Sequence, residues 1–449
     1  MTDRTARRRI WGWYFFDWAS QPYNTLLLTF IFAPYMRDLI GDGSRAQAIW
    51  GYGVGAAGIL IALVAPLLGG IADVAGPHVR LRFIRVFSVF YVLGSAGLWN
   101  AVPGDFSLVA VMGCFVLGLI GMELATIFTN AMLPGLAPPD QIGRISGTGW
   151  AFGYLGGLSA LTLVLLFFAE NARTGVTLIG IPPLFGLDPA LREGTRAVGP
   201  LTAIWYAVFV TPFFLWVREP RAAVPVPLAA ALRMAFADLR AALRRLPGQR
   251  SLAAFLAASM FYREALNGLY FFGGIYAAGV LDWTVVDVGV FGLLAVLTGA
   301  VFAWLGGQAD MRFGPKPVVL TCILALICAA LAAVLIAPGR VLGVTVPDTS
   351  RLPDLAFYGV GMMVGAAGGA LQAASRSLMT RQAEPGRITQ GFGLYALAGK
   401  ASAFVAPFSV ALVTDLTGSQ QIGILPLLGL FLMGLVLLFW VRADGDRPR

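Results

Sequence analysis

The most prominent pattern in the chain is a series of long apolar stretches, separated by short segments that hold most of the charged residues. A membrane-spanning helix needs about 20 consecutive, mostly apolar residues. Twelve stretches meet this requirement, and they predict twelve spanning helices. Their expected bounds are 10–36, 48–72, 83–101, 107–133, 145–169, 201–217, 251–279, 287–309, 318–338, 355–379, 391–413 and 423–441.

The connection between the sixth and seventh spans has a different pattern. Apolar residues recur there at helical spacing, and arginines occupy the other face. The apolar residues are Leu228, Leu232, Phe236, Leu239, Leu243 and Leu246, and the arginines are Arg233, Arg240, Arg244 and Arg245. The pattern predicts an amphipathic helix, which either lies in the membrane interface or packs as a soluble helix on the cytoplasmic ends of the spans. Residues 218–250 would then link an N-terminal bundle, 1–217, to a C-terminal bundle, 251–449.

Composition agrees with a membrane protein and excludes several other classes. Of the 449 residues, 58% are hydrophobic and only 12% are charged, and the mean hydropathy is +0.78. A soluble protein of this size needs a charged exterior, a disordered chain needs low hydrophobicity, and a disulfide scaffold needs more than three cysteines. No cluster of metal ligands, nucleotide-binding loop or Ser–His–Asp set is visible in the sequence. We therefore expect no metal, no cofactor and no enzyme activity.

The basic residues are distributed unevenly between the connections. Of the 32 Lys and Arg residues, 23 fall in the N-terminal segment and in alternate connections, whereas 7 fall in the connections on the other side. Cytoplasmic connections of membrane proteins carry the excess of Lys and Arg. The net charge of +9 therefore reports membrane topology and not nucleic-acid binding. Both termini are expected to be cytoplasmic.

Two short motifs occur twice, at matching places in the two halves. Residues 69–73 read Gly-Gly-Ile-Ala-Asp at the end of the second span, and residues 306–310 read Gly-Gly-Gln-Ala-Asp at the end of the eighth. Residues 144–146 read Arg-Ile-Ser at the start of the fifth span, and residues 387–389 read Arg-Ile-Thr at the start of the eleventh. The offsets of 237 and 243 positions are similar. They predict two pseudo-symmetric six-helix bundles.

Five charged residues lie deep inside the predicted spans, away from their ends: Asp17, Glu123, Arg263, Glu264 and Lys400. An ionisable group is costly in the hydrocarbon core, so each one is a candidate for substrate binding or ion coupling. For each of them, an ion pair or hydrogen bond that only fixes helix packing is the alternative interpretation.

The first span carries a polar stripe beside a proline. Tyr14, Asp17, Gln21 and Asn24 follow steps of three or four residues, which place them on one helix face. Pro22 removes a backbone hydrogen bond and is expected to kink the helix beside this stripe. A kink in a cavity-lining helix exposes carbonyl groups to a ligand.

The seventh and eleventh spans carry the positively charged candidates. Arg263 lies near the middle of its span, and Asn267 is four residues further on the same face. The planar guanidinium group suits a carboxylate or phosphate. Adjacent helix residues point about 100° apart, so Arg263 and Glu264 need not pair with each other. Lys400, one of only two lysines, lies too deep to be a simple end anchor. A desolvated lysine can exchange a proton, and so can a buried carboxylate such as Glu123.

Twelve spans in two related halves, with Gly-x-x-x-Asp and then basic residues after the second and eighth spans, resemble the major facilitator superfamily. Three longer blocks resemble one branch of it, the vacuolar amino-acid effluxers and their bacterial relatives. Residues 13–23 read Trp-Tyr-Phe-Phe-Asp-Trp-Ala-Ser-Gln-Pro-Tyr, residues 147–157 read Gly-Thr-Gly-Trp-Ala-Phe-Gly-Tyr-Leu-Gly-Gly, and residues 371–377 read Leu-Gln-Ala-Ala-Ser-Arg-Ser.

This resemblance implies an all-α integral membrane protein with two six-helix bundles, which expose a central site alternately to each side of the membrane. In that fold the first, fourth, seventh and tenth spans line the central cavity, which adds Gln372 of the tenth span to the candidates. The resemblance also implies a cytoplasmic gate built on the carboxylates Asp73 and Asp310. The candidate basic residues of this gate are Arg80, Arg144, Arg312, Arg376 and Arg387.

The expected function is secondary transport of a small polar organic solute, with an amino acid or peptide-like molecule favoured. Export and coupling to protons are expected. The expected partners are the solute, the lipid bilayer and protons, and the expected form is a monomer in a bacterial inner membrane. Two alternatives remain open: a lipid or amphiphile translocator, and a non-transporting receptor or assembly factor on the same fold.

Overall fold

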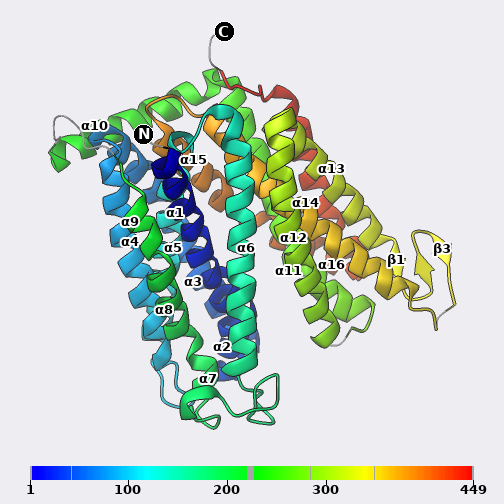
Figure 1. Cartoon of the computed structure of the whole chain (residues 1–449). Helices are drawn as coiled ribbons and strands as arrows, with labels where there is room; N and C mark the ends of the chain where they lie inside the picture. The colour runs from blue at the N-terminus through cyan, green and yellow to red at the C-terminus, as the bar shows by residue number, and fades with distance from the viewer. Residues whose placement is uncertain (1–2, 42, 220–226, 284, 348, 447–449) are drawn as a thin grey trace. The chain divides into compact units, whose positions relative to one another are not determined.

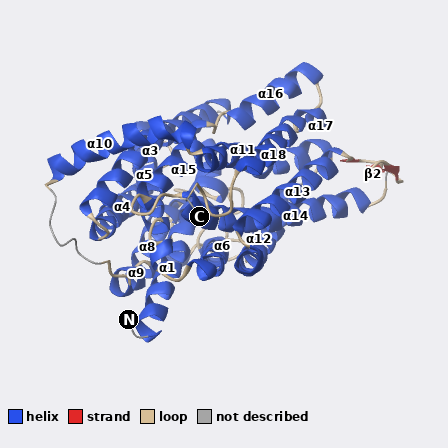
Figure 2. Ribbon diagram, turned by 90° about the horizontal axis from the view of Figure 1, so that it is seen from above, coloured by secondary structure: helices blue, strands red, loops and turns tan. Residues whose placement is uncertain are grey.

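The computed structural model describes residues 3–41, 43–219, 227–283, 285–347 and 349–446, and helices make up nearly all of them (Figures 1 and 2). The chain forms two compact units. Unit 1 comprises Met1–Ala65, Ile71–Met132 and Phe152–Ala231, and unit 2 comprises Pro66–Gly70, Leu133–Ala151 and Leu232–Arg449. The division at residues 217 and 250 stays a prediction.

Among the described residues, unit 1 contains helices and loops, with α-helices and one π-helix as its main elements. In chain order these are α1 (Asp3–Pro22), the π-helix η1 (Tyr23–Phe30), α2 (Phe32–Ile40), α3 (Gly43–Ala75), α4 (His78–Gly97), α5 (Leu108–Asn130), α6 (Ile142–Phe167), α7 (Glu193–Arg196), α8 (Val198–Phe209) and α9 (Thr211–Trp216). Residues 66–70 of α3 and 142–151 of α6 belong to unit 2.

Unit 2 adds further helices and one small sheet, and residues 228–231 at the start of α10 belong to unit 1. Its further elements are α10 (Leu228–Arg245), α11 (Arg250–Val280), α12 (Val285–Phe313), α13 (Pro315–Val334), α14 (Leu352–Gln382), α15 (Ile388–Ala401), α16 (Val405–Thr417), α17 (Gln420–Gly423) and α18 (Leu425–Leu437). Strands β1 (Ile336–Ala337), β2 (Arg340–Val341) and β3 (Val344–Thr345) form an antiparallel sheet in that order.

Ten helices or helix pairs in the described part of the chain are long and apolar enough to cross a membrane. The two remaining predicted spans, 10–36 and 251–279, coincide with α1–η1–α2 and with α11. These two passages are less apolar because they carry the polar stripe of the first span and the Arg263–Glu264 pair of the seventh. These two less apolar passages are thus the ones that carry the most candidate residues for solute binding.

Glycines explain why parts of α3 and α6 belong to unit 2. A Cβ atom at Gly69 would lie 2.6 Å from the carbonyl oxygen of Thr389, at the start of α15. A Cβ atom at Gly147 of α6 would lie 2.7 Å from the Cα atom of Gly307 in α12. Only residues without a side chain permit such an approach. The repeated motifs found in the sequence therefore meet each other in space.

The predicted amphipathic helix is present as α10. Ala235 on this helix is fully buried and packs against Gly70, while Asp238 forms an ion pair with Arg387 at 3.1 Å. Leu232 and Phe236, which the sequence placed on the apolar face, are 41% and 60% exposed. The helix is therefore held to unit 2 by its small residues, and its place in a membrane interface stays a prediction. Residues 220–226 of the predicted linker and the side chains of Leu228 and Leu243 lie outside the described set.

Candidate functional site

The eleventh span, predicted as one helix, is broken in two. α15 ends at Ala401 and α16 begins at Val405, with a turn at residues 402–404. The cause is visible in the sequence, because Pro407 has no N–H group and its ring would clash with the carbonyl group of Ala403 in a continuous helix. The break leaves a helix end on each side of it, within the segment that crosses the membrane.

Glu264 of α11 binds one of these helix ends. Glu264 is only 3% exposed, and its Oε1 atom accepts a hydrogen bond of 3.1 Å from the backbone N–H of Ala406 in the first turn of α16. A helix N-terminus carries a partial positive charge and N–H groups without an intrahelical partner. The carboxylate therefore satisfies a backbone donor that the break has exposed.

Arg263 of the same helix binds the other half of the broken span. Its Nη1 donates to the carbonyl oxygen of Tyr395 at 3.3 Å, and the guanidinium carbon lies 4.4 Å from the centre of the Tyr395 ring. A Cβ atom at Gly399 would lie only 2.7 Å from Nη1, so the arginine packs directly on the glycine backbone. Two adjacent residues of α11 thus contact α15 and α16 separately, in agreement with the expectation that they need not pair.

Lys400 lies next to Gly399, in the last turn of α15, and its side chain is half-buried. A cation in this position is favoured by the partial negative charge at the end of a helix. Arg263, Glu264 and Lys400 therefore gather at the break. Asn267 is exposed on α11, and Gln372 is half-buried on α14.

The candidates of unit 1 are arranged along helix contacts. α1 ends at Pro22, where the chain continues as the π-helix η1. Asp17 and Gln21 face the glycines of α6: Cβ atoms at Gly153 and Gly157 would lie 3.5 Å from the Cβ atom of Asp17 and 3.0 Å from the Cγ atom of Gln21. Asn24, within η1, instead directs its Nδ2 atom to the Sδ atom of Met122 on α5, 4.0 Å away. Glu123 follows on α5 and is half-buried. The predicted stripe therefore contacts two neighbouring helices, because Asp17 and Gln21 face α6 and Asn24 faces α5.

The two carboxylates of the predicted gate have different surroundings. Asp73 forms an ion pair with Arg80 at 3.1 Å. Asp310 is 1% exposed, its carboxyl group lies against Gly143, and neither oxygen has a hydrogen-bond partner within the described residues. The gate itself stays a prediction.

The arginines of the predicted gate have several kinds of partner. Arg376 donates to Oγ and to the carbonyl oxygen of Ser146, at 2.9 and 2.7 Å. Arg387 pairs with Asp238. Arg144 donates to Gln141 at 3.1 Å, and Arg312 lies over the ring of Phe313.

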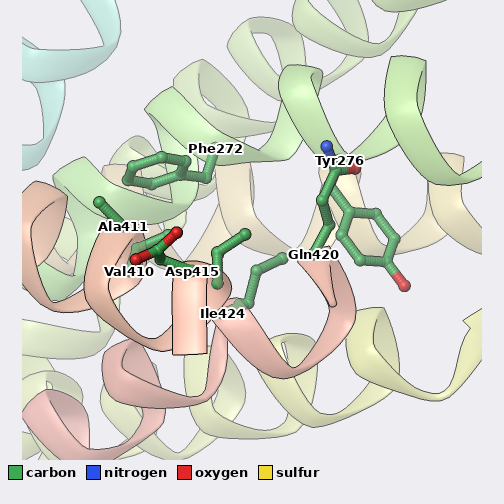
Figure 3. A pocket seen from close by; sticks show the side chains of 8 residues that line it. Phe272, Tyr276, Val410, Ala411, Asp415, Gln420 and Ile424 are labelled. Carbon is green, nitrogen blue, oxygen red and sulfur yellow. The ribbon is translucent and has the colours of Figure 1, made fainter. Parts of the chain in front are cut away.

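Unit 2 also contains a cavity of about 360 Å³ that the sequence did not indicate (Figure 3). Its lining comes from α11, α16 and α17 and is mostly apolar. The lining residues are Phe272, Tyr276, Val410, Ala411, Thr414, Asp415, Gln420 and Ile424. Asp415 escaped notice because it lies just beyond the predicted eleventh span, 391–413.

Solved structures identify the class of protein. The structure matches the proton:xylose symporter XylE, of the major facilitator superfamily, with a TM-score of 0.72 and 11% identity over 98% of this chain and 95% of that chain. It matches the human organic anion transporter MFSD10 (TETRAN) with a TM-score of 0.67 and 18% identity over 96% of this chain and 99% of that chain. The predicted fold class is confirmed: apart from the small sheet β1–β3 the described chain is helical, and it is a multi-pass membrane protein with the major facilitator fold.

Sequence comparison gives the family. The family model described as "Vacuole effluxer Atg22 like" matches residues 38–448, and the chain belongs to this family. It is similar to the uncharacterized MFS-type transporter YxiO of Bacillus subtilis (strain 168), with 23% identity over 96% of this chain and 94% of that protein.

The chain is also similar to Autophagy-related protein 22 of Cryptococcus neoformans var. neoformans serotype D (strain JEC21), with 24% identity over 68% of this chain. The matched part spans 51% of that protein's length. The chain is therefore an MFS-type transporter and not an enzyme, with a small-molecule substrate and the lipid bilayer as partners.

Proposed function

We propose that the protein exports a small polar organic solute, an amino acid or a peptide-like molecule, and that protons drive the export. The two bundles would expose the solute site alternately to the two faces of a bacterial inner membrane. Both termini would be cytoplasmic, and the protein would act as a monomer. The description of the family, "Vacuole effluxer Atg22 like", supports the movement of a solute out of a compartment.

The observation that carries this proposal is the charged break in the eleventh span. Interrupted helices in transporters place helix ends and unpaired backbone groups inside the membrane, where they bind ions and charged substrate groups. Here the guanidinium of Arg263 and the carboxylate of Glu264 contact the two sides of the break, and Lys400 lies in the last turn before it. A zwitterionic solute carries complementary groups for each of them.

We assign the positive groups to the substrate carboxylate. Arg263 offers a planar fork that suits this group, and Lys400 offers a compact charge. Asp17 and Glu123 of unit 1 are the candidates for the substrate ammonium group. Gln21, Asn24, Asn267 and Gln372 are the further polar candidates along the path.

We assign the coupling proton to a carboxylate, with Glu264 as the first candidate. Protonation would remove the charge that Glu264 places at the N-terminus of α16 and would weaken its bond to Ala406. The two halves of the eleventh span could then change their relative orientation. Proton binding would thereby act on the same helix break that contacts the substrate.

Counterflow in proteoliposomes tests this function. Amino acids, short peptides, sugars and organic anions would be screened first by thermal shift, because a ligand that binds the folded state stabilises it. Solutes that bind would then be tested for exchange and for response to a pH gradient. Arg263→Ala and Lys400→Ala should abolish or strongly reduce flux, whereas Arg173→Ala, at an exposed loop position, should not. Asp17→Asn and Lys400→Ala variants with intact flux and intact pH dependence would contradict the assignment.

The cavity of unit 2 favours a second candidate, an amphiphilic solute. Its lining is mostly apolar, with the carboxylate of Asp415 as its one charged group (Figure 3). Such a lining suits an apolar tail that carries an amine. Asp415→Asn should then reduce flux of long-chain amines while amino-acid flux is unchanged. Transport of amino acids without any transport of amphiphiles would exclude this candidate.

A further inference from the structure

The connection between α6 and α7 contains an unusually apolar loop. Residues 174–187 include no charged residue. Several of their large side chains are exposed: Leu178 at 73%, Ile179 at 52%, Leu184 at 38% and Phe185 at 87%. Contact with water is unfavourable for apolar side chains. An exposed apolar patch of this kind therefore marks an interaction surface.

The loop does not project away from the spanning helices. The backbone N–H of Leu178 donates to the carbonyl oxygen of Leu165, in the last turn of α6, at 3.1 Å. The ring of Phe185 lies 6.0 Å from that of Phe168, which follows the end of α6. Both apolar tips of the loop are therefore held beside the end of a helix that crosses the membrane.

A buried polar network fixes the base of the loop. Glu170, whose side chain is fully buried, accepts hydrogen bonds from Nε of Arg192 at 2.9 Å and from Oγ1 of Thr195 at 2.6 Å. Arg196 donates to the carbonyl oxygen of Trp99 at 2.7 Å and lies over its ring. These bonds fix both ends of the connection to the rest of unit 1. The exposed positions of the apolar side chains are therefore set by the fold.

The backbone at the tip carries a conformational cost. Phe185 has a φ of 62°, a value rare for a residue with an aromatic side chain, and Gly186 follows with a φ of 70°. This geometry turns the most exposed large apolar side chain of the described residues outward, at the membrane end of α6. The conformational cost at Phe185 is offset when its side chain moves from water into an apolar environment.

We infer that residues 174–187 insert into the headgroup–acyl boundary of the leaflet at the C-terminal end of α6. The loop is continuous with the membrane-facing surface of that helix, where Leu163 is also exposed. An uncharged loop with leucine, isoleucine and phenylalanine side chains at this depth fits the interfacial region of a bilayer. The loop anchors unit 1 in one leaflet, whatever solute is transported.

Site-directed fluorescence in proteoliposomes tests this placement. The full chain, with Cys114, Cys322 and Cys328 replaced by alanine, would carry a single environment-sensitive fluorophore at Leu178→Cys or Phe185→Cys. Ile179→Cys provides another site in case one variant does not fold. Ala190→Cys is the matched control, since Ala190 is exposed in the same connection and lies between the charged residues Asp188 and Arg192.

Insertion predicts a blue shift at Leu178 and Phe185, relative to Ala190, in liposomes of a neutral phospholipid. Nitroxide lipids labelled near the headgroup should quench this emission more than lipids labelled near the chain end, and iodide in the buffer should quench it weakly. Emission at Ala190 should be quenched by iodide. The inference is overturned if Phe185 and Leu178 behave like Ala190. It is equally overturned if both quenchers fail, because the loop would then be covered by protein.

Discussion

The fifth and eleventh spans begin with related sequences, yet they are built differently. α6 is one continuous helix from Ile142 to Phe167, and it packs on α1 through small residues such as Gly153 and Gly157. The eleventh span is divided into α15 and α16, and it contacts α11 through the charged side chains of Arg263 and Glu264. Close glycine packing fixes the position of α6 against α1. In contrast, the positions of α15 and α16 against α11 depend on two charged side chains.

The same comparison holds for individual positions. The offset that relates Arg144 to Arg387 relates Gly157 to Lys400 and Gln21 to Glu264. Gly157 and Gln21 pack against each other in unit 1. At the related positions of unit 2, Lys400 and Glu264 carry charge, and Glu264 contacts Ala406 of the broken span. We interpret the break in unit 2 as the site of coupling, whereas Gly157 provides close helix packing and Gln21 is a neutral polar candidate along the solute path.

The largest effect is expected from removing the carboxylate at the break. Glu264→Ala would leave the N–H of Ala406 without its partner inside the membrane, and an unsatisfied buried donor costs roughly 1–3 kcal/mol. The thermal unfolding temperature should fall for this reason, and counterflow should fall strongly because the contact that sets the geometry of the break is lost. Gln21→Ala, at the related position, should have a much smaller effect. Equal losses from both variants would remove the distinction between the two contacts.

A second effect concerns the glycine contact of unit 1. Gly157→Val would place a side chain against Thr25 and Gln21, where a Cβ atom already lies 3.0 Å from the Cγ atom of Gln21. Overpacking of this kind costs roughly 1–3 kcal/mol, so the unfolding temperature should fall clearly. Gly113→Val is the control, because a Cβ atom at Gly113 of α5 meets nothing within 4 Å. If both variants unfold at the same temperature, close packing does not hold α6 to α1.

A smaller effect is expected at the proline that causes the break. Pro407→Ala restores an N–H group, which allows a bond to the carbonyl oxygen of Ala403 and a more continuous helix. Hydrogen exchange at residues 402–408 should become slower, while flux should decrease because the break is needed. Faster exchange, or unchanged flux with slower exchange, would show that the break has no part in transport.

The smallest effect is expected at Arg144 and Arg387, the related arginines at the starts of the fifth and eleventh spans. Arg387 pairs with Asp238 at 3.1 Å, whereas Arg144 donates to Gln141. Partly exposed ion pairs contribute at most about 1 kcal/mol, so Arg387→Ala should lower the unfolding temperature only slightly. Arg144→Ala should lower it less. A large loss for either variant in salt-free buffer would reveal a stronger contact at the start of that span.

Much of the fold followed from the sequence, because apolar length and charge distribution are local properties of a chain. The repeated motifs indicated two related halves, but not which helix ends meet. The break at residues 402–404 was missed although Pro407 was visible, because an apolar count does not register a lost hydrogen bond. The eight-residue π-helix after Pro22 was missed for a related reason, since periodicity predicted a kink and not a change of helix type.

The candidate site was predictable as a set of residues but not as an arrangement. Rarity of charge within the spans selected Arg263, Glu264 and Lys400. Their partners depend on which residues α15 and α16 bring near α11, and no local pattern contains that information. The cavity with Asp415 is a further example, because its lining joins α11 to α16 and α17, which lie far from α11 in the sequence.

The central claim is that the break in the eleventh span couples proton and solute movement through Glu264. The most direct test is pH-gradient-driven flux in proteoliposomes by the wild-type protein and by Glu264→Gln, with a solute identified by counterflow. Glutamine keeps a hydrogen-bond acceptor for Ala406 but cannot carry the charge. The account predicts that Glu264→Gln still exchanges solute but no longer responds to the pH gradient. A gradient response equal to that of the wild-type protein would contradict it.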